Sequence, residues 1–471
     1  MAEDKSPIRV LEFYSGIGGL RYSLEKSGVK ADLVEAFDIN ELANDVYEHN
    51  FGHRPTQGNI QGLTVQQLDK YKADSWLMSP PCQPYTRQGL QKDADDARAS
   101  SFLKIMELLP LMASPPAHVL VENVVGFENS VTHSRLLAVL EDAGFVIQEF
   151  ILSPLQFGIP YSRPRYFCLA KTNSEDFVEP GYNGQLLCSP GPLLHLKQTQ
   201  SNSHIFENVK DSKKTSGLYS KSGNGTSLND LRQVPGAPPI QLKRNEPIIN
   251  PAVQCGTVGD YLESIPVHAM EEGIGDRLAG PSSSDGNSPA LTSASQCSLH
   301  QDSGLPGRNI VGDPEQANSN RGQSTSLPHG DQWEPYKVPM NVVERWIDAY
   351  DIVTPQCRRC CCFTKSYSRY AKGTGSFLAT KVSLKEEDTL EKHIFDLRLE
   401  GRSLASLGLR YFTPREVANL HSFPDSFRFP AHIKLKQRYA LLGNSLSVAV
   451  VGSLIKYLFS TRTLREPLVG Q

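Results

Sequence analysis

Cysteine is scarce in this 471-residue chain, and its scarcity excludes a disulfide-stabilised scaffold. There are nine cysteines, an odd number, which favours free thiols in a reducing compartment. Four of them lie together at 357 and 360–362 and form a single Cys-x-x-Cys without a second pair. A tetrahedral site needs four ligands from separated directions, so we expect no metal site.

Long apolar runs are also missing. The longest, residues 448–459, is interrupted by Lys456 and is too short to span a bilayer. The first residues lack the apolar segment of a signal peptide. We therefore expect no membrane association, and a cytoplasmic location that extends to the nucleus.

The net charge is only −3, which argues against a polybasic protein that binds nucleic acid through phosphate neutralisation alone. The charge is unevenly distributed, however: residues 1–172 carry −5, 173–335 carry −7 and 336–471 carry +9. Six basic residues and no acidic ones fall between Arg358 and Lys381. Such a run forms either a solvated surface or part of a groove for a negatively charged partner.

The first 172 residues alternate short apolar runs with helical patterns. Strands are predicted at 8–14, 32–37, 75–78, 118–121, 145–151 and 166–170, and helices from 19 and at 41–50, 101–112 and 134–143. Strands that alternate with helices predict an α/β fold with a parallel, doubly wound sheet.

The composition then changes. Between 280 and 330, 27 of 51 residues are Ser, Gly, Pro or Asn and none is Phe, Trp or Tyr, so we expect disorder over about 270–330. Order resumes near Trp333, with helices expected over 340–350, from Thr413 as N-cap, and over 448–459. We divide the chain into a first domain, 1–172 completed by 410–471, and an intervening region, 173–409.

A glycine-rich turn follows the first predicted strand. Ile17, Gly18 and Gly19 lie where the backbone can approach a ligand at the switch point of the sheet. Asp38 ends the second strand, 20 residues after Gly18, where an acidic side chain can bind ribose hydroxyls. The spacing is not that of a full dinucleotide motif. It indicates an adenosine-type cofactor other than NAD, or else an ordinary tight turn and a helix-capping aspartate.

Ser79-Pro80-Pro81-Cys82-Gln83-Pro84 follows another predicted strand. The two prolines stiffen the backbone and place Cys82 at the carboxyl edge of the sheet, where ligands bind. There a cysteine is a nucleophile if cations stabilise its thiolate, or else a small core residue. Carbon 5 of a pyrimidine needs a covalent adduct at carbon 6 before it can accept a methyl group, whereas enzymes that methylate exocyclic amines use an aromatic residue in this place.

Two further segments carry charged side chains at strand ends. Glu122 leaves a strand beside an apolar run, so its pKa can be raised and its proton can bond a cytosine ring nitrogen; the alternative is a solvent-facing carboxylate. Arg163 and Arg165 alternate before the next strand and share one face, which suits an anion or a base carbonyl, or a surface ion pair.

These segments, in this order and with the late 437–445 segment, resemble the cytosine-5 methyltransferases. A finer match is Cys362-Phe363-Thr364-Lys365, followed by 373–376 and 411–416. It resembles the DNA-methyltransferase-2 family, whose members keep a DNA-methyltransferase fold but modify an anticodon-loop cytosine of aspartate transfer RNA. The resemblance covers about 1–172 and 333–460.

The resemblance implies a Rossmann-like methyltransferase domain with a smaller target-recognition domain, and methyl transfer from S-adenosylmethionine to carbon 5 of cytosine 38 of tRNA-Asp. Cys82 would add to carbon 6, Glu122 would bond N3, and Arg163 and Arg165 would bind the base carbonyl and steady the thiolate. The residues it assigns to the cofactor are Ile17, Gly18, Gly19, Asp38, Ile60, Ser79, Pro81 and Ser445. Those it assigns to the substrate are Cys362, Phe363, Thr364 and Lys365.

Two alternatives stay open, a DNA cytosine-5 methyltransferase and a homologue that binds nucleic acid without turnover. The intact set Cys82, Glu122, Arg163 and Arg165 disfavours the second, because a binding module does not need the nucleophile. The resemblance at Cys362–Lys365 favours RNA, so we expect tRNA as the main partner and DNA as a weaker one. We expect the protein to be a monomer.

Overall fold

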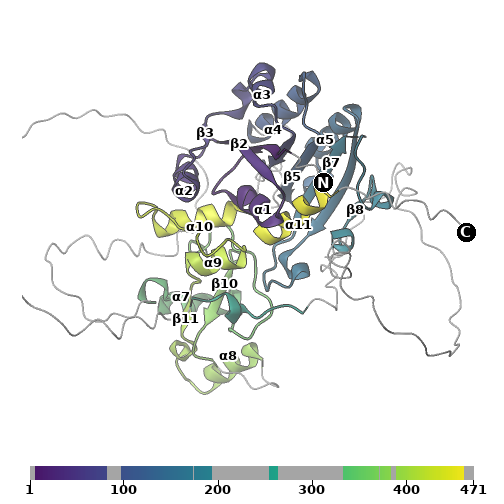
Figure 1. The fold of residues 1–471 in the computed structure, drawn as a ribbon. Coiled ribbons are helices and arrows are strands. Elements are labelled where there is room, and N and C mark those ends of the chain that lie inside the picture. The colour runs from purple at the N-terminus through teal and green to yellow at the C-terminus, as the bar shows by residue number, and fades with distance from the viewer. Residues whose placement is uncertain are drawn as a thin grey trace, which may run out of the picture.

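An eight-stranded sheet forms the centre of the larger of two lobes (Figure 1). The computed structural model describes residues 6–81, 97–172, 174–193, 254–263, 333–370, 372–382 and 389–460. In their order across the sheet, the strands are β3 (Thr56–Gln57), β2 (Ala31–Asp38), β1 (Ile8–Phe13), β4 (Ser75–Met78), β5 (His118–Val124), β7 (Arg165–Thr172), β6 (Phe145–Leu152) and β8 (Leu186–Leu187). From β3 to β5 all neighbours pair in parallel, as predicted.

Strand β7 departs from the predicted parallel sheet, because it runs antiparallel to both β5 and β6. The connection from β6 to β7 contains only the short 3₁₀ helix η6 (Pro154–Phe157) and no crossover helix of the kind that joins parallel strands. The antiparallel register places Arg165, at the start of β7, opposite Val124, at the end of β5. The reversal therefore brings Arg163 and Arg165 to the carboxyl edge where β1, β4 and β5 end.

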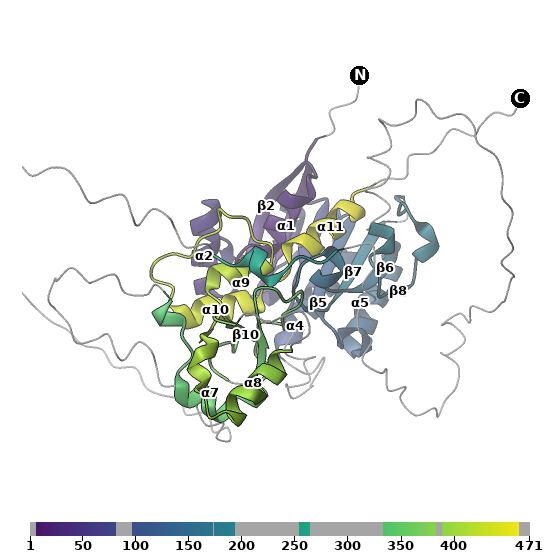
Figure 2. The same ribbon diagram turned by 90° about the horizontal axis from the view of Figure 1, so that it is seen from below.

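Helices cover both faces of the sheet. Val10 of β1 packs in a core with α1 (Gly19–Ser27) and α11 (Val448–Leu458). Its neighbour Leu11 points to the other face and packs with α3 (Val65–Tyr71), α4 (Ala97–Leu108) and α5 (Val131–Asp142). The helices α1 and α11 lie side by side (Figures 1 and 2). This three-layer arrangement confirms the predicted α/β class.

Helix α10 (Leu435–Asn444) and α11 together make an apolar stretch, Leu435–Leu458, that is long enough to cross a membrane. Its most apolar window has a mean hydropathy of 1.4, but 72% of that window is buried inside the structure. The core helices of a globular protein have the same character, so the length and composition of this stretch are weak evidence for a span.

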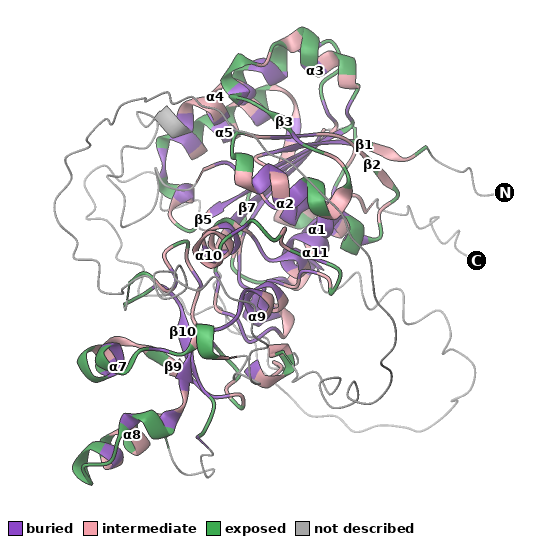
Figure 3. Ribbon diagram, turned by 90° about the vertical axis from the view of Figure 1, so that its left-hand side faces the viewer, coloured by how far each residue is buried: buried purple, intermediate pink, exposed green. Residues whose placement is uncertain are grey.

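A smaller lobe lies beside the carboxyl ends of the strands (Figure 2). It contains a three-stranded sheet, β11 (Leu409–Arg410), β10 (Ser376–Ala379) and β9 (Asp351–Val353), and the helices α7 (Met340–Trp346), α8 (Leu390–Leu399) and α9 (Pro414–Leu420). Its sheet is mostly buried, whereas α7 and α8 show many exposed residues (Figure 3). Thr413 is the N-cap of α9, as predicted, because its Oγ1 accepts from Glu416 N at 3.1 Å.

The larger lobe continues past residue 172. Strand β8 pairs with β6, and Phe177 and Leu193 are buried on the face that α11 covers. The change of composition that placed the boundary at 172 therefore falls inside the larger lobe. The division into 1–172 with 410–471 and an intervening 173–409 stays a proposal, and the expected insertion at 270–330 lies outside the described residues.

Candidate active site between the sheet and the smaller lobe

A cavity of about 370 Å³ opens where β1, β2, β4 and β5 end. Its opposite wall is the C-terminal end of α10 and the residues that follow it. The predicted residues that line this cavity are Ile17, Gly19, Asp38, Ser79, Pro81, Glu122, Arg163, Arg165 and Ser445. Antiparallel β7 and the late helix α10 thus bring distant motifs to one place.

The glycine-rich turn is held by its own backbone. Ser15 N donates to Phe37 O at 3.1 Å and Gly18 N donates to Ser15 O at 2.9 Å. Gly18 has a φ of +84°, which favours glycine, and a Cβ there would lie 2.3 Å from the ring of Phe51. Gly18 therefore shapes the turn and does not line the cavity. A Cβ on Gly19 would lie 3.1 Å from Ser445 Oγ, so this glycine lets the end of α10 approach.

Asp38 is held at the rim of the cavity by backbone donors. Its two carboxylate oxygens accept from Gly16 N and Asn40 N, each at 2.8 Å. Burial raises the pKa of Asp38, and these backbone hydrogen bonds oppose the rise. Each oxygen keeps a second lone pair, so the carboxylate is oriented and can still accept from hydroxyl groups of a ligand.

The cavity lining fits an adenosine-type cofactor. Ser15 Oγ is buried and has no hydrogen-bond partner among the described residues, so a polar ligand group would satisfy it. Ile39 is 68% exposed and lines the cavity beside Asp38, which suits the face of an apolar ring. A carboxylate, backbone amides and serine hydroxyls next to an apolar surface match a ribose, an amino-acid group and a base.

Ile60 is placed elsewhere. Its side chain is 5% exposed and packs in the core with Phe37 and Leu68, and it is not among the residues that line the cavity. Ile39, Asn40 and Asn444 line the cavity although they were not predicted to do so. Ile39 and Asn40 follow Asp38 directly at a strand end, and Asn444 precedes Ser445, so their positions in sequence were the available signal.

Glu122 and Arg165 face each other at the cavity. Arg165 Nε lies 3.4 Å from Glu122 Oε1. Burial raises the pKa of Glu122, and the charges of Arg165 and Arg163 act against that rise. The carboxyl can therefore hold a proton nearer neutrality than an exposed glutamate can. The side chain of Arg165 is 17% exposed, so its guanidinium retains donors for a ligand.

Arg163 is deeply buried, and its guanidinium donors join the two lobes. Its NH1 donates to Cys362 Sγ at 3.1 Å and to Phe363 O at 3.2 Å. Its NH2 donates to Gly443 O at 3.0 Å and to Ser445 O. Because these donors are committed to protein acceptors, Arg163 braces the site, and Arg165 is the better candidate to bind the base carbonyl.

The predicted substrate segment, 362–365, adjoins this brace. Burial disfavours ionisation of Cys362, but the charges of Arg163 and Arg165 outweigh it and lower the pKa of its thiol. The ring of Phe363 is 1% exposed and packs against the rings of Tyr161 and Phe412. Its ring therefore belongs to the core and supports the segment from within, and its assignment to the substrate stays a prediction.

Thr364 and Lys365 lie against the end of α10. A Cβ on Gly443 would lie 2.3 Å from Lys365 N, so only glycine permits this approach. Gly443 itself lines the cavity. Thr364 and Lys365 therefore stand at its margin without lining it.

Cys82 lies outside the described residues. Ser79 and Pro81, which precede it, line the cavity, and Ser79 Oγ donates to Tyr14 O at 2.9 Å. Ser79, Pro80 and Pro81, the last described residues before Cys82, therefore belong to the cavity wall.

Comparisons with known proteins agree with this geometry. The sequence profile of the family described as C-5 cytosine-specific DNA methylase matches residues 8–246 and 309–460. The human protein named tRNA (cytosine(38)-C(5))-methyltransferase is 36% identical over 96% of this chain and 99% of its own length. A Dictyostelium discoideum protein named DNA (cytosine-5)-methyltransferase is 31% identical over 96% of this chain and 94% of its own.

Among solved structures, the Schizosaccharomyces pombe Dnmt2 methyltransferase is similar with a TM-score of 0.58 and 28% identity, and the match covers 96% of this chain and 98% of that one. The matched residues include the glycine-rich turn, the Glu122 strand, the arginine pair and the end of α10. The chain belongs to the C-5 cytosine-specific methylase family and, within it, to the DNA-methyltransferase-2 group.

Proposed function

We propose that the protein methylates carbon 5 of cytosine 38 in the anticodon loop of tRNA-Asp, with S-adenosylmethionine as methyl donor and through a covalent adduct with Cys82. The observation that carries the proposal is the meeting of Glu122 and Arg165 at a cavity whose wall includes Ser79 and Pro81, the residues that precede Cys82 in sequence. Glu122 can supply a proton, Arg165 can bind a carbonyl, and a cysteine can supply the nucleophile that carbon 6 of cytosine requires.

The residues divide the reaction as follows. The Cys82 thiolate forms a bond to carbon 6 while Glu122 donates its proton to N3, so that the ring becomes an electron-rich enamine. Arg165 holds the base carbonyl in place, and carbon 5 then takes the methyl group. A base takes the proton from carbon 5, the double bond between carbons 5 and 6 re-forms with expulsion of the Cys82 thiolate, and N3 returns its proton to Glu122. The bound cofactor supplies an electrophilic methyl group on a sulfonium centre.

Several residues would hold the cofactor. Asp38 is oriented to accept from ribose hydroxyls, Ile39 offers an apolar surface to the base, and Ser15 and Ser445 lie where an amino-acid group can bind. The close packing of Gly19 against Ser445 keeps both walls of this site together.

Relatives whose names specify tRNA support an RNA substrate. The cost of extruding the target base supports it as well. A cytosine in an unpaired loop is extruded at lower cost than one in a duplex, and RNA-binding proteins usually recognise such loops. The second candidate is a duplex DNA substrate, which the similarity to the Dictyostelium DNA (cytosine-5)-methyltransferase favours.

The test is transfer of a tritiated methyl group to three substrates side by side. We expect labelling of a tRNA-Asp transcript, no labelling of the same transcript with uridine at position 38, and weak labelling of duplex DNA. Stronger labelling of the duplex would overturn the RNA assignment.

The covalent step has its own test. A transcript with 5-fluorocytidine at position 38 should trap a protein–RNA adduct that survives denaturation, because fluorine cannot leave carbon 5 as a proton does. Cys82→Ala should form no adduct and transfer no methyl group while it still binds the cofactor. Methyl transfer by this variant would refute the adduct.

A further inference from the structure

A closed loop, residues 364–374, stands at the margin of the cavity. Its ends are joined because Thr364 N donates to Thr374 O at 2.9 Å. Inside it, Tyr367 N donates to Thr364 O at 3.0 Å and Thr374 Oγ1 donates to Tyr370 O at 2.8 Å. The first residues of the loop pack on Gly443, which lines the cavity. The described residues of the loop, 364–370 and 372–374, thus have a fixed position beside the site.

The two described tyrosines of this loop have opposite environments. Tyr367 is 1% exposed; its hydroxyl donates to Ser376 O at 2.7 Å and accepts from Phe412 N at 3.0 Å. Tyr370 is 46% exposed, and within the described part of the chain its hydroxyl forms no hydrogen bond and its ring stacks on no other aromatic ring. The ring of Tyr367 anchors the loop, and the ring of Tyr370 is left partly exposed to solvent.

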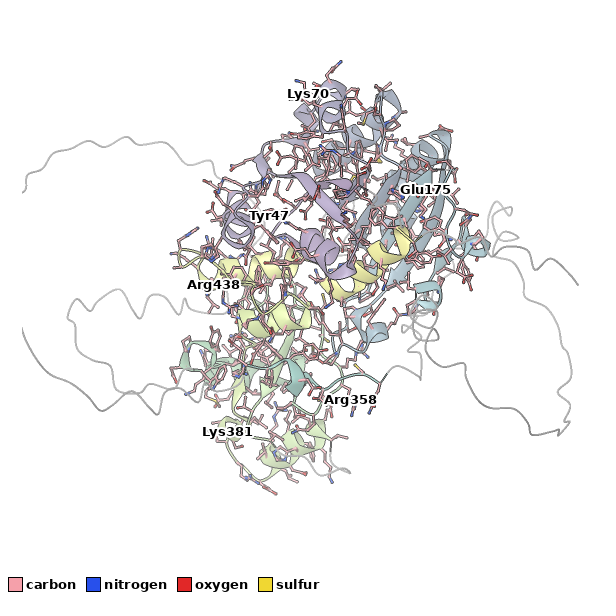
Figure 4. All side chains as sticks on the ribbon, viewed as in Figure 1. Tyr47, Lys70, Glu175, Arg358, Lys381 and Arg438 are labelled. Carbon is pink, nitrogen blue, oxygen red and sulfur yellow. The ribbon has the colours of Figure 1, made fainter. Side chains whose placement is uncertain are left out.

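Three cations surround the exposed ring in sequence. Lys365, Arg369 and Lys372 are all exposed, the loop contains no acidic residue, and within the described ranges none of the three forms an ion pair. The other basic residues of the 358–381 run are spread over the lobe: Figure 4 shows Arg358 and Lys381 at different sides of it. Three of the six cations of the run therefore lie on the loop beside the cavity.

We propose that this loop binds the unpaired RNA strand next to the target cytosine, with the ring of Tyr370 stacked on a neighbouring base and Lys365, Arg369 and Lys372 on phosphates. The inference rests on the proposed function and adds to it the contact that holds the strand while the target base is in the cavity. An aromatic ring among cations matches a single strand, whose base presents a π-face and whose backbone carries one charge per nucleotide.

A duplex does not offer such a ring a partner, because its bases are already stacked on one another. The loop therefore favours an unpaired strand over a duplex for a physical reason. An exposed aromatic side chain by itself is common on protein surfaces. Here the ring lies at the margin of the cavity among three cations that form no ion pair with any described residue, and this setting indicates a nucleic-acid strand as its partner.

The experiment measures methyl transfer by the full-length protein on an anticodon stem-loop RNA, with Tyr370→Ala, Tyr370→Phe and, as a matched control, Phe395→Ala. Phe395 is another exposed aromatic residue of the same lobe, on α8, with 63% exposure. We expect Tyr370→Ala to raise KM about 10-fold, and Tyr370→Phe and Phe395→Ala to match the wild type.

The decisive comparison removes the base instead of the ring. RNAs with an abasic site on the 5′ or the 3′ side of the target should include one on which wild type and Tyr370→Ala have the same KM, because the stacked pair is then already broken. If Tyr370→Ala raises KM equally on all these RNAs, or does not raise it on the intact one, the stacking is refuted.

Salt dependence tests the phosphate contacts. Arg369→Ser and Lys372→Ser should each reduce the slope of log affinity against log salt by about 0.7, the value for one contact with a single strand. Lys381→Ser should leave the slope unchanged, and an equal reduction in all three would overturn the assignment. Failure of the wild type to methylate RNA would refute the proposed function, whereas RNA methylation without these effects refutes the loop alone.

Discussion

The guanidinium of Arg163 donates to the Sγ of Cys362 at 3.1 Å, across 199 residues of sequence. The contact joins the approach to β7, in the larger lobe, to the segment that leads into the smaller lobe. The same guanidinium also bonds Gly443 and Ser445 at the end of α10. One buried side chain therefore sets the position of three segments around the cavity.

Substitution of Arg163 should lower stability, whereas substitution of Arg165 should lower activity. Arg163→Lys loses most of the hydrogen bonds to its four acceptors, so we expect the free energy of unfolding to fall by about 2–5 kcal/mol. The free energy of unfolding of Arg165→Lys should equal that of the wild type, because Arg165 bonds few protein groups. The rate of methyl transfer by this variant should fall about 100-fold or more. Thermal unfolding and tritium transfer measure the two effects, and equal destabilisation by both variants would contradict the division of roles.

Gly443→Ala tests the contact between α10 and the 362–365 segment. The added Cβ would lie 2.3 Å from the carbonyl carbon of Thr364 and from Lys365 N, which are backbone atoms that cannot move aside cheaply. We expect a loss of about 1–3 kcal/mol in unfolding free energy together with loss of methyl transfer. Gly62→Ala is the control, because its Cβ would meet no atom within 4 Å.

Tyr161→Phe tests the hydrogen bonds that position Phe363. The Tyr161 hydroxyl accepts from Phe363 N at 3.2 Å and lies 3.3 Å from Nε2 of His421. Burial holds the pKa of His421 well below its usual range; its neutral ring therefore donates from Nδ1 to Val417 O and accepts from Tyr161 at Nε2.

Removal of that hydroxyl leaves two buried groups unpaired, so we expect a loss of about 1–3 kcal/mol. Tyr350→Phe is the matched control, since its buried hydroxyl has no partner within the described residues. Chemical denaturation of both variants should show a clear loss for Tyr161→Phe and almost none for Tyr350→Phe. The reverse order would show that the Tyr161 hydroxyl does not hold the segment.

Glu12 should make the stability depend on pH. It is a buried residue of β1 and accepts from Tyr47 OH at 2.8 Å and from Arg21 N, in the first turn of α1, at 3.3 Å. Burial raises the pKa of its carboxyl to about 8 from 4.5. Between these pH values the folded state binds more protons than the unfolded state, so stability falls as pH rises through this window.

Glu12→Gln carries no titrating proton and should remove this dependence. We expect the melting temperature of the wild type to decline relative to that of Glu12→Gln as the pH is raised from 5 to 8. Thermal unfolding of both proteins at each pH unit measures the difference. Parallel profiles would show that the carboxyl ionises in the folded state as it does in the unfolded one.

Residues 275–328 should be dispensable for the fold. The described segments before and after this region both end beside the ion pair of Arg410 and Glu416. Glu263 N, before it, donates to Glu416 Oε1 at 3.2 Å. The ring of Trp333, after it, lies 4.4 Å from the Arg410 guanidinium. Arg410 and Glu416 are themselves joined by two hydrogen bonds, at 2.6 and 2.7 Å. Deletion of 275–328 should leave the melting temperature within a few degrees of the wild type; loss of soluble protein would assign that segment a structural role.

Local patterns in the sequence were sufficient for the elements and motifs of the larger lobe. Strand β4 and the start of α1 lie where the apolar runs and the glycines predicted them, because burial of a short strand and a glycine turn are written in adjacent residues. Asp38 and Ser79 line the cavity for the same reason: a strand end in a parallel sheet always points to the same edge.

What the sequence could not provide are contacts between distant segments. The resemblance assigned Ile60 to the cofactor, and local sequence could not show that Ile60 packs in the core with Phe37 and Leu68. Arg163 reads like Arg165 in sequence, and only the approach of Cys362 and Gly443 separates a bracing arginine from one that is free to bind a ligand. The reversal of β7 likewise depends on the whole connection and not on the strand's own residues.

Helix α11 has a consequence for how the protein is made. It packs along α1, so closely that a Cβ on Gly452 would lie 3.1 Å from Ser23 O, and Ser445 just before it completes the cavity. A ribosome that synthesises this chain releases α1 more than 400 residues before α11. The apolar side of α1 therefore stays exposed to solvent during nearly the whole of translation. A chain that stops before α10 lacks both the second wall of the cavity and the helix that covers this part of the core.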